Sequence, residues 1–162
     1  MIQTSQHKQT DIRWRWQTLG FGRPLVQTLG GYGCTVASLA NMSSVLGKNW
    51  TPAEFNNRLK QVNGFASNAY VKEKVLVDWL AIEKILPVKH IIRVRDRYTA
   101  NDDKIVKASI KSGMPVMIEF KHPSGFRHWC LAVGDGMIVD PLKGLVKFST
   151  YPVSGYSLYK RK

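Results

Sequence analysis

The chain has 162 residues, of which 24 are Lys or Arg and 11 are Asp or Glu, so its formal net charge is +13. Hydrophobic residues make up 44% and aromatic residues 10%, a globular composition that excludes a disordered chain. This length predicts one domain over residues 1–162, with a loose polar segment over residues 1–12.

The positive charge predicts an anionic partner: nucleic acid, an anionic cell wall, anionic lipid or an acidic protein surface. The alternative is a solvated basic surface that aids solubility. No apolar run approaches the ~18–20 residues that span a bilayer, and the first residues lack the apolar core of a secretory signal. We therefore expect neither a transmembrane segment nor a signal peptide.

Helix signals fill the first half of the chain. "RWRW" (residues 13–16) fits an edge strand, a binding arm or two packed tryptophans. An apolar stripe predicts a helix over residues 35–46 that Gly47 ends. In "WTPAEFNNRLKQVNG", Thr51 and a Glu three residues later predict a capping box. A third helix is expected over much of residues 69–86, ending before a proline.

Strand signals dominate the second half. Residues 88–96 read as a strand, and "TANDDKIVKASIKSG" (residues 99–113) reads as a helix with acidic residues in its first turn. Further strands are expected over residues 115–120, 127–134, 137–141, 144–149 and 156–160. Helices followed by antiparallel strands predict an α+β fold.

Cys34 follows three glycines and precedes the first predicted helix. A thiolate is the reactive form of cysteine, and a helix N-terminus stabilises it with free N–H groups and the positive end of the dipole. Cys34 is therefore a candidate nucleophile. The alternative is a small buried residue at a turn.

A nucleophile needs a base, and an imidazole base needs an orienting acid. Among the four histidines, His128 opens an apolar strand, which would hold its ring rigidly. Asp140 ends the next strand, and pairing through the "GDG" turn at residues 134–136 brings Asp140 opposite residues 129–130. Asp135 is the rival acid, but it lies in the turn, where Asp is favoured for structural reasons.

Cys130 lies two residues after His128 and therefore shares its face of the strand. A Cys34–Cys130 disulfide is an alternative that would abolish thiol chemistry. For the oxyanion of an acyl-transfer reaction, the candidates are the Cys34 backbone N–H and the Gln27 side chain. The histidines show no zinc-ligand spacing and no HExxH occurs, so we expect no metal and no cofactor.

Three blocks of the sequence, which together span roughly residues 18–148, resemble the papain-like cysteine peptidases. They are "GGYGCTVASLANMSSVLG" with the following "WTPAEFNNRLKQVNGF", "GMPVMIEF…RHWCLAVG", and "MIVDP". The likeness is to the branch related to the double-glycine leader peptidases of bacteriocin exporters. It implies an N-terminal helical lobe packed on a C-terminal antiparallel sheet, with the active site in the cleft between them.

By this resemblance Cys34 is the nucleophile, His128 the general base and acid, and Asp140 the residue that orients it. Gln27 corresponds to the oxyanion glutamine, although it lies seven residues before the cysteine where six is common. Thr35 stands where the leader peptidases usually have glycine, which makes leader processing a poorer fit.

The sequence thus predicts a cysteine-dependent amide hydrolase. We expect a peptidoglycan endopeptidase or amidase of phage lysis or of a phage tail tip or baseplate. Its partners would be peptidoglycan or a peptide substrate, an anionic surface and other virion proteins, and it would act in the virion or in the host cytoplasm before lysis. The rivals are a structural or assembly protein of a phage particle with a vestigial site, and a basic nucleic-acid-binding module, for which no known motif is present.

Overall fold

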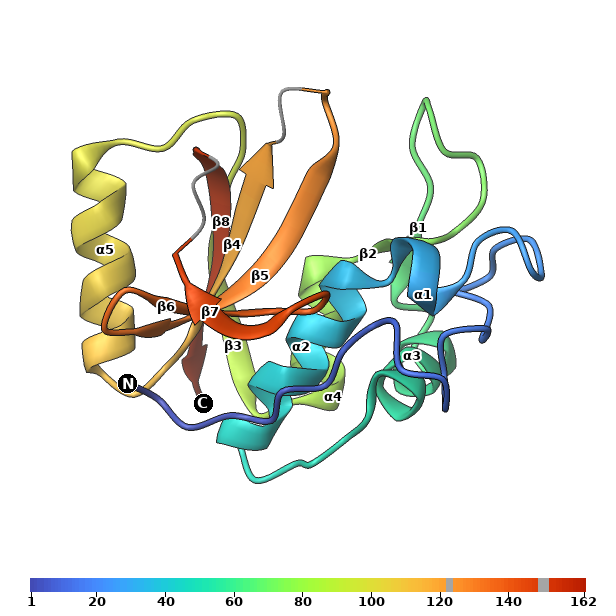
Figure 1. Ribbon diagram of the computed structural model, residues 1–162, viewed down its shortest axis with the longest axis horizontal. Coiled ribbons are helices and arrows are strands. Elements are labelled where there is room, and N and C mark those ends of the chain that lie inside the picture. The colour runs from blue at the N-terminus through green and yellow to red at the C-terminus, as the bar shows by residue number, and fades with distance from the viewer. Residues whose placement is uncertain (122–123, 149–151) are drawn as a thin grey trace.

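The computed structural model describes residues 1–121, 124–148 and 152–162. Its centre is a six-stranded antiparallel sheet in the order β3-β8-β4-β5-β6-β7 (Figure 1). The strands are β3 (Val88–Val94), β4 (Val116–Lys121), β5 (Arg127–Gly134), β6 (Met137–Asp140), β7 (Gly144–Lys147) and β8 (Val153–Arg161). The structure agrees with the α+β class expected from the sequence. Residue 149, the last of one expected strand, lies outside the described residues.

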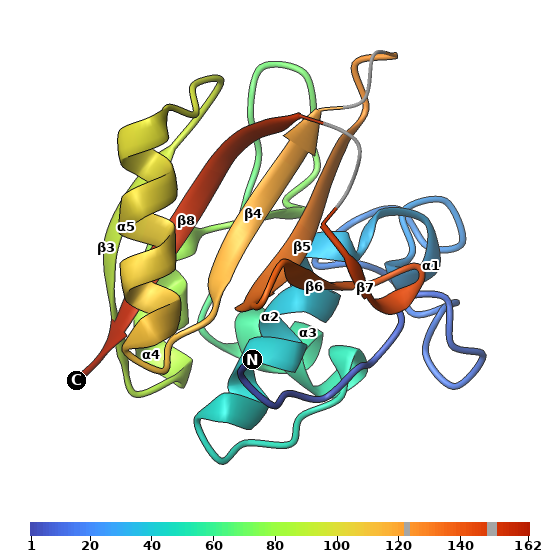
Figure 2. The same ribbon diagram turned by 60° about the vertical axis from the view of Figure 1, so that its left-hand side comes forward.

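The helices lie on both sides of this sheet. They are α1 (Leu29–Tyr32), α2 (Cys34–Val45), α3 (Pro52–Gln61), α4 (Ile82–Ile85) and α5 (Ala100–Lys111). A 3-10 turn (Trp79–Ala81) precedes α4, and β1 (Phe65–Ala66) pairs with β2 (Leu76–Val77) apart from the main sheet. In Figures 1 and 2, α5 covers one face of the sheet, whereas α2, α3 and α4 gather on the other.

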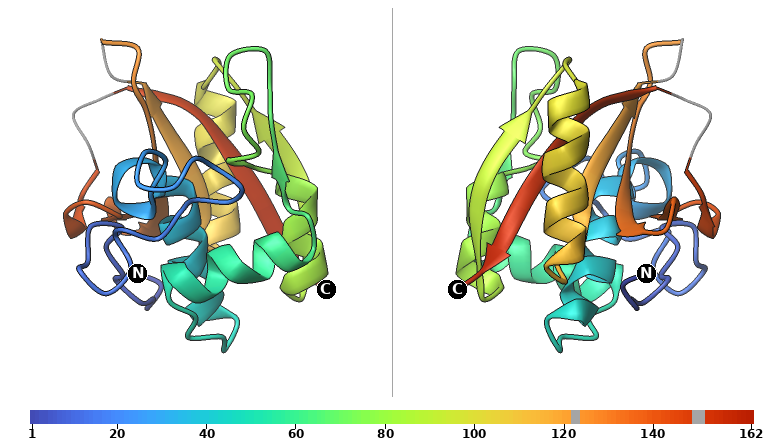
Figure 3. Two further views of the ribbon diagram at one scale, coloured as in Figure 1. Left: turned by 90° about the vertical axis from the view of Figure 1, so that its right-hand side faces the viewer. Right: turned by 90° about the vertical axis from the view of Figure 1, so that its left-hand side faces the viewer.

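The alternation of side chains along β5 explains the two layers. Leu131 and Val133 belong to the apolar core shared with α2, whereas Cys130 and Ala132 belong to the core under α5. Because successive strand residues point to opposite faces, one apolar strand serves both cores. The two side views in Figure 3 show the sheet enclosed between these helical layers.

The helix signals in the sequence are confirmed at α2, α3 and α5. Thr51 accepts a bond from the Glu54 N–H at the start of α3 while the Glu54 carboxylate accepts from the Thr51 N–H. Thr99 and Asp102 form the same reciprocal cap at the start of α5. These caps satisfy N–H groups that a helix start leaves without partners.

The expected long helix over residues 69–86 is wrong. The structure forms β2, a 3-10 turn and the four-residue α4 there, and only the last part is helical. The Asp78 side chain accepts from the Leu80 N–H and starts the turn, while Val77 pairs with Phe65. The β-branched valines before residue 78 suit an extended chain, so tertiary pairing overrides the helical spacing.

Residues 1–12, expected to be loose, make specific contacts in the structure. The Ile2 N–H donates to the Val133 carbonyl at 2.7 Å, and the Gln9 N–H donates to the Pro141 carbonyl at 2.8 Å. The His7 N–H donates to the side chain of Asn41. Polar composition alone did not show these partners, because they belong to α2, to β5 and to the turn between β6 and β7. Among the described residues, no helix combines the length and apolar character needed to cross a membrane.

Candidate active site

Cys34 is the first residue of α2. The preceding Gly33 is the N-cap, and among the described residues no side chain caps this helix. A Cβ at Gly33 would come within 2.4 Å of the Leu29 carbonyl oxygen, so only glycine fits where α1 runs into α2. The first N–H groups of the helix therefore remain available, beside the thiol, for an anionic sulfur or an oxyanion.

His128 and Asp140 meet as the sequence predicted. The His128 Nε2 and Asp140 Oδ1 atoms lie 3.0 Å apart, and the Leu142 N–H donates to the same carboxylate oxygen at 2.7 Å. The strand register explains this meeting, because Leu131 pairs with Val139 across the turn, which places Asp140 next to the start of β5. The rival Asp135 instead pairs with the Met1 ammonium group.

The three site residues interact electrostatically. Burial opposes a charge on His128 and is the strongest single influence, but the hydrogen bond with Asp140 and the influence of the Cys130 and Cys34 thiols outweigh it and raise the pKa of His128. Burial likewise opposes the charge on Asp140, yet the bonds from His128 and the Leu142 N–H lower its pKa. A carboxylate thus stabilises an imidazolium that faces two sulfur atoms, which is the arrangement that favours a thiolate.

The two cysteines have different environments although both are free. Cys34 is 8% exposed at the helix start, whereas Cys130 is fully buried in the core under α5. Burial raises the pKa of the Cys130 thiol, although the influence of His128 opposes the change. Cys130 is therefore the poorer nucleophile, and Cys34 is the thiol that a substrate can approach.

Ser38 joins the cysteine helix to the histidine strand. Its hydroxyl donates to the Trp129 carbonyl at 3.0 Å, and the bond is buried. Ser38 lies one helical turn after Cys34, and Trp129 is the neighbour of His128, so this bond ties the helix that carries Cys34 to the strand that carries His128. The helical spacing of four residues from Cys34 is the signal that could have found Ser38 in the sequence.

Two further side chains hold the His128 segment. The Phe126 ring stacks on the His128 ring, with 6.1 Å between centroids and 23° between planes. Arg127 forms an ion pair at 3.1 Å with Glu119, whose side chain is buried. Because β6 pairs with β5 only from residue 131 onward, these contacts fix the part of β5 that extends beyond β6.

The other candidates of the sequence lie elsewhere. The Gln27 side chain accepts from the Arg23 N–H at 2.8 Å and donates to Glu73 at 3.3 Å, so its oxyanion role stays a prediction that requires these bonds to open. The His90 ring bonds to Ser157, and His122 lies outside the described residues.

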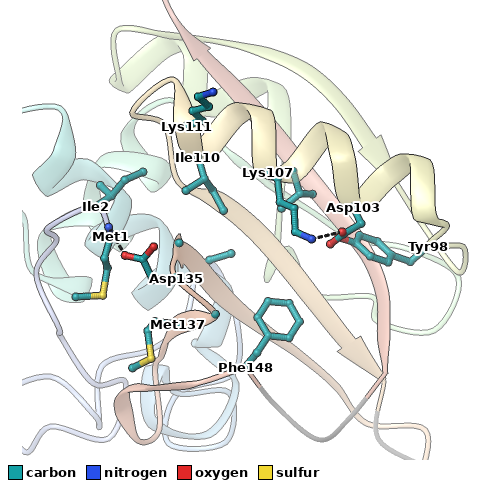
Figure 4. A pocket seen from close by; sticks show the side chains of 14 residues that line it. Met1, Ile2, Tyr98, Asp103, Lys107, Ile110, Lys111, Asp135, Met137 and Phe148 are labelled. Atoms are coloured by element: carbon teal, nitrogen blue, oxygen red, sulfur yellow. Dashed lines mark hydrogen bonds and ion pairs between the residues drawn. The ribbon is translucent and has the colours of Figure 1, made fainter.

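A cavity of about 670 Å³ lies apart from these residues, between α5, the β5–β6 turn and the first residues of the chain (Figure 4). Met1, Ile110, Met137 and Phe148 supply apolar walls. Its two carboxylates are already paired, Asp135 with the Met1 ammonium and Asp103 with Lys107, and Lys111 also lines it. None of the Cys34, His128 and Asp140 side chains lines it, so the cavity is not part of the candidate site.

The site thus combines a thiol at a helix start, an imidazole and a carboxylate on adjacent strands, and free backbone donors. This set can perform nucleophilic acyl transfer. No protein-family model, curated protein or solved structure matches the chain.

Proposed function

We propose that the protein is a cysteine-dependent amide hydrolase with a papain-like arrangement, in which Cys34 is the nucleophile, His128 the general acid and base, and Asp140 the orienting residue. The observation that carries the proposal is the His128–Asp140 bond of 3.0 Å beside a cysteine at the uncapped start of α2. The three residues come from separate parts of the chain, and the Ser38–Trp129 bond, which joins α2 to β5, supports the proposal.

In the proposed mechanism, the Cys34 thiolate attacks the carbonyl carbon of the amide. The carbonyl oxygen becomes an oxyanion, which the Cys34 backbone N–H stabilises. The His128 imidazolium gives its proton to the leaving nitrogen, the C–N bond breaks, and a thioester remains on Cys34. Neutral His128 then takes a proton from water, whose oxygen attacks the thioester. Collapse of this second intermediate restores the thiolate and releases a carboxylate.

The proposed substrate is the peptide part of bacterial peptidoglycan, within a phage lysis or virion-associated function. The net charge of +13 would favour binding to anionic cell-wall polymers. Tyr32, Phe126 and Leu142 are large apolar side chains exposed to solvent, and each lies two residues from a member of the proposed triad. They offer apolar contact to a bound peptide.

The test is release of muropeptides from purified cell walls, compared between the wild type and Cys34→Ala. We expect this substitution to abolish release. Ala100→Ser is the matched control, because Ala100 is the equivalent first residue of α5 and is exposed. Iodoacetamide labelling followed by peptide mass spectrometry assigns any inactivation to Cys34 or to Cys130.

Each outcome separates one part of the proposal. Hydrolysis that persists after complete alkylation of Cys34 excludes the cysteine mechanism. Cleavage of peptide amides without muropeptide release supports the hydrolase and excludes the cell-wall substrate. A folded wild type that cleaves neither supports the rival assignment to a structural or assembly protein of a phage particle.

A further inference from the structure

His128, Cys130 and Asp140 form a compact group of metal-ligating side chains. One nitrogen of His128, the sulfur of Cys130 and a carboxylate oxygen of Asp140 all lie within 4.8 Å of one another. Binding of one ion between them therefore needs only small side-chain rotations. The group lies on two adjacent strands, which hold it more rigidly than a loop would.

The ligand atoms and their surroundings favour zinc among the common divalent ions. Zinc accepts sulfur, nitrogen and oxygen ligands in a tetrahedral arrangement, and thiolate ligands discriminate against magnesium and calcium. Cys130 is fully buried and Asp140 nearly so, which removes competing water. In addition, the His128 Nδ1 atom is buried without a hydrogen-bond partner among the described residues, so the ring has an unused ligand atom in a water-poor site.

We propose that His128, Cys130 and Asp140 bind a single Zn²⁺ ion, and that the Cys34 thiolate takes the fourth position. Binding displaces the Cys130 thiol proton and the one proton held by the Cys34–His128 pair, which leaves two metal-bound thiolates and a neutral imidazole, with no redox step. A coordinated Cys34 cannot attack a carbonyl. Inhibition of amide hydrolysis by zinc rests on the proposed hydrolase function, whereas zinc binding itself does not.

Cys130 gives this site its distinguishing feature. The proposed hydrolysis uses Cys34, His128 and Asp140, whereas zinc binding requires Cys130 as well. The four ligands are separated by 94, 2 and 10 positions along the chain, so motif spacing could not reveal them. The sequence-based expectation of no metal rested on that spacing.

The experiment titrates the reduced, metal-free chain with Zn²⁺ by isothermal calorimetry and with Co²⁺ by absorption spectroscopy. We expect one ion per chain and thiolate-to-cobalt charge-transfer absorption. Cys130→Ser should weaken zinc binding by more than the about 10–100-fold that loss of an outer partner of a metal ligand costs. His90→Asn is the control, because His90 is half-buried and bonds to Ser157 outside this site.

A second measurement uses the native chain and does not depend on whether a variant folds. Saturating Zn²⁺ should protect Cys34 from maleimide labelling, and a chelator should restore the labelling. Labelling of Cys34 that zinc does not change overturns the proposal, as does a Cys130→Ser variant that folds and binds zinc as tightly as the wild type. Hydrolysis by Cys34→Ala would exclude the proposed function but would not change the result of the zinc titration of the wild type, so the two failures are distinguishable.

Discussion

The two long helices, α2 and α5, have the same length of twelve residues and pack on opposite faces of one sheet, but their first turns differ. The α5 helix begins with the reciprocal Thr99–Asp102 cap and carries Asp102 and Asp103 in its first turn. The α2 helix has neither a side-chain cap nor an acidic residue there, and its first residue is Cys34.

The capped start of α5 contributes to stability, whereas the uncapped start of α2 leaves backbone N–H groups available to a bound anion. At α5 the protein's own side chains satisfy the helix N-terminus, and negative carboxylates complement its dipole. At α2 the same favourable interactions remain unused, so a thiolate or an oxyanion can take them. Gly33 maintains the open start, because any Cβ there would collide with the backbone of Leu29. A helix start that lacks its cap at the end of a glycine-rich segment is therefore a useful indicator of a site.

After Cys34→Ala, the largest effect is expected for Asp140→Asn. The variant loses the acceptor that holds the His128 ring and its positive charge, and we expect hydrolysis to fall by about 10²–10⁴-fold. In the wild type, the raised pKa of His128 preserves the imidazolium and its thiolate partner above the usual pH of about 6.5. The alkaline limb of the pH–rate profile should therefore move to lower pH in the variant. An unchanged profile would contradict the role of Asp140.

The same pair gives a pH dependence of stability. The raised pKa of His128 means that its stabilising contribution is complete below pH about 6.5 and is lost as the pH rises through the folded-state value. The lowered pKa of Asp140 means that its contribution is complete above pH about 4 and is lost as the pH falls. Urea denaturation across this pH range, in the wild type and in Asp140→Asn, measures both contributions. The free energy of unfolding of the variant should depend less on pH than that of the wild type.

The next effect is expected for Gly33→Ala. Its added Cβ meets the Leu29 carbonyl oxygen at 2.4 Å, and backbone cannot rotate away as a side chain can. We expect the free energy of unfolding to fall by about 3 kcal/mol and the Cys34 thiol to move from its position at the start of α2. Gly47→Ala is the control for adding a methyl group in open space, although the positive φ of 74° there carries its own smaller penalty. Equal effects of the two substitutions would show that close packing at Gly33 is unimportant.

Ser38→Ala should have a smaller effect on stability and a distinct effect on catalysis. Removal of the buried hydroxyl leaves the Trp129 carbonyl without this donor, and we expect a loss of about 2 kcal/mol. Ser38 is a positioning residue, so kcat should fall more than KM rises. Ser109→Ala on α5 removes a comparable bond to the Met114 carbonyl and should leave kcat unchanged. A fall of kcat in both variants would indicate a general loss of stability.

The smallest effect is expected for Thr99→Ala, which removes the cap of α5. We expect about 1 kcal/mol of lost stability from thermal denaturation and no change in hydrolysis, because α5 supplies no residue to the candidate site. A strong effect on hydrolysis would show that the two helix starts are coupled through the sheet.

The sequence predicted those parts of the structure whose conformation depends on residues that are close together in the chain. Helix caps at Thr51 and Thr99, the apolar alternation of β5 and the turn before β6 all carry short-range signals, and the pairing of His128 with Asp140 followed from counting outward from that turn. Cys34 could be placed at a helix start, and so considered as a candidate nucleophile, because the glycines and the helix are adjacent to it in the chain.

The parts that escaped prediction depend on distant partners. The extended chain before Trp79 is held by pairing with residues 65–66, and the first twelve residues by Asn41, Val133 and Pro141. The Ser38–Trp129 bond joins residues 91 positions apart, and its partner cannot be read from either local sequence. The Gln27 role stays a prediction, since its amide is bonded elsewhere.

The position of β8 has a consequence for the order in which the protein can fold during synthesis. This strand comes last in the described chain but lies inside the sheet, between β3 and β4. Until residues 153–161 leave the ribosome, β4 has an open edge next to the hairpin that carries His128 and Asp140. A nascent chain would therefore have β3 and β4 in place before the strand that joins them. Pairing across such sequence separations is slow, so the sheet would be completed only after translation of β8.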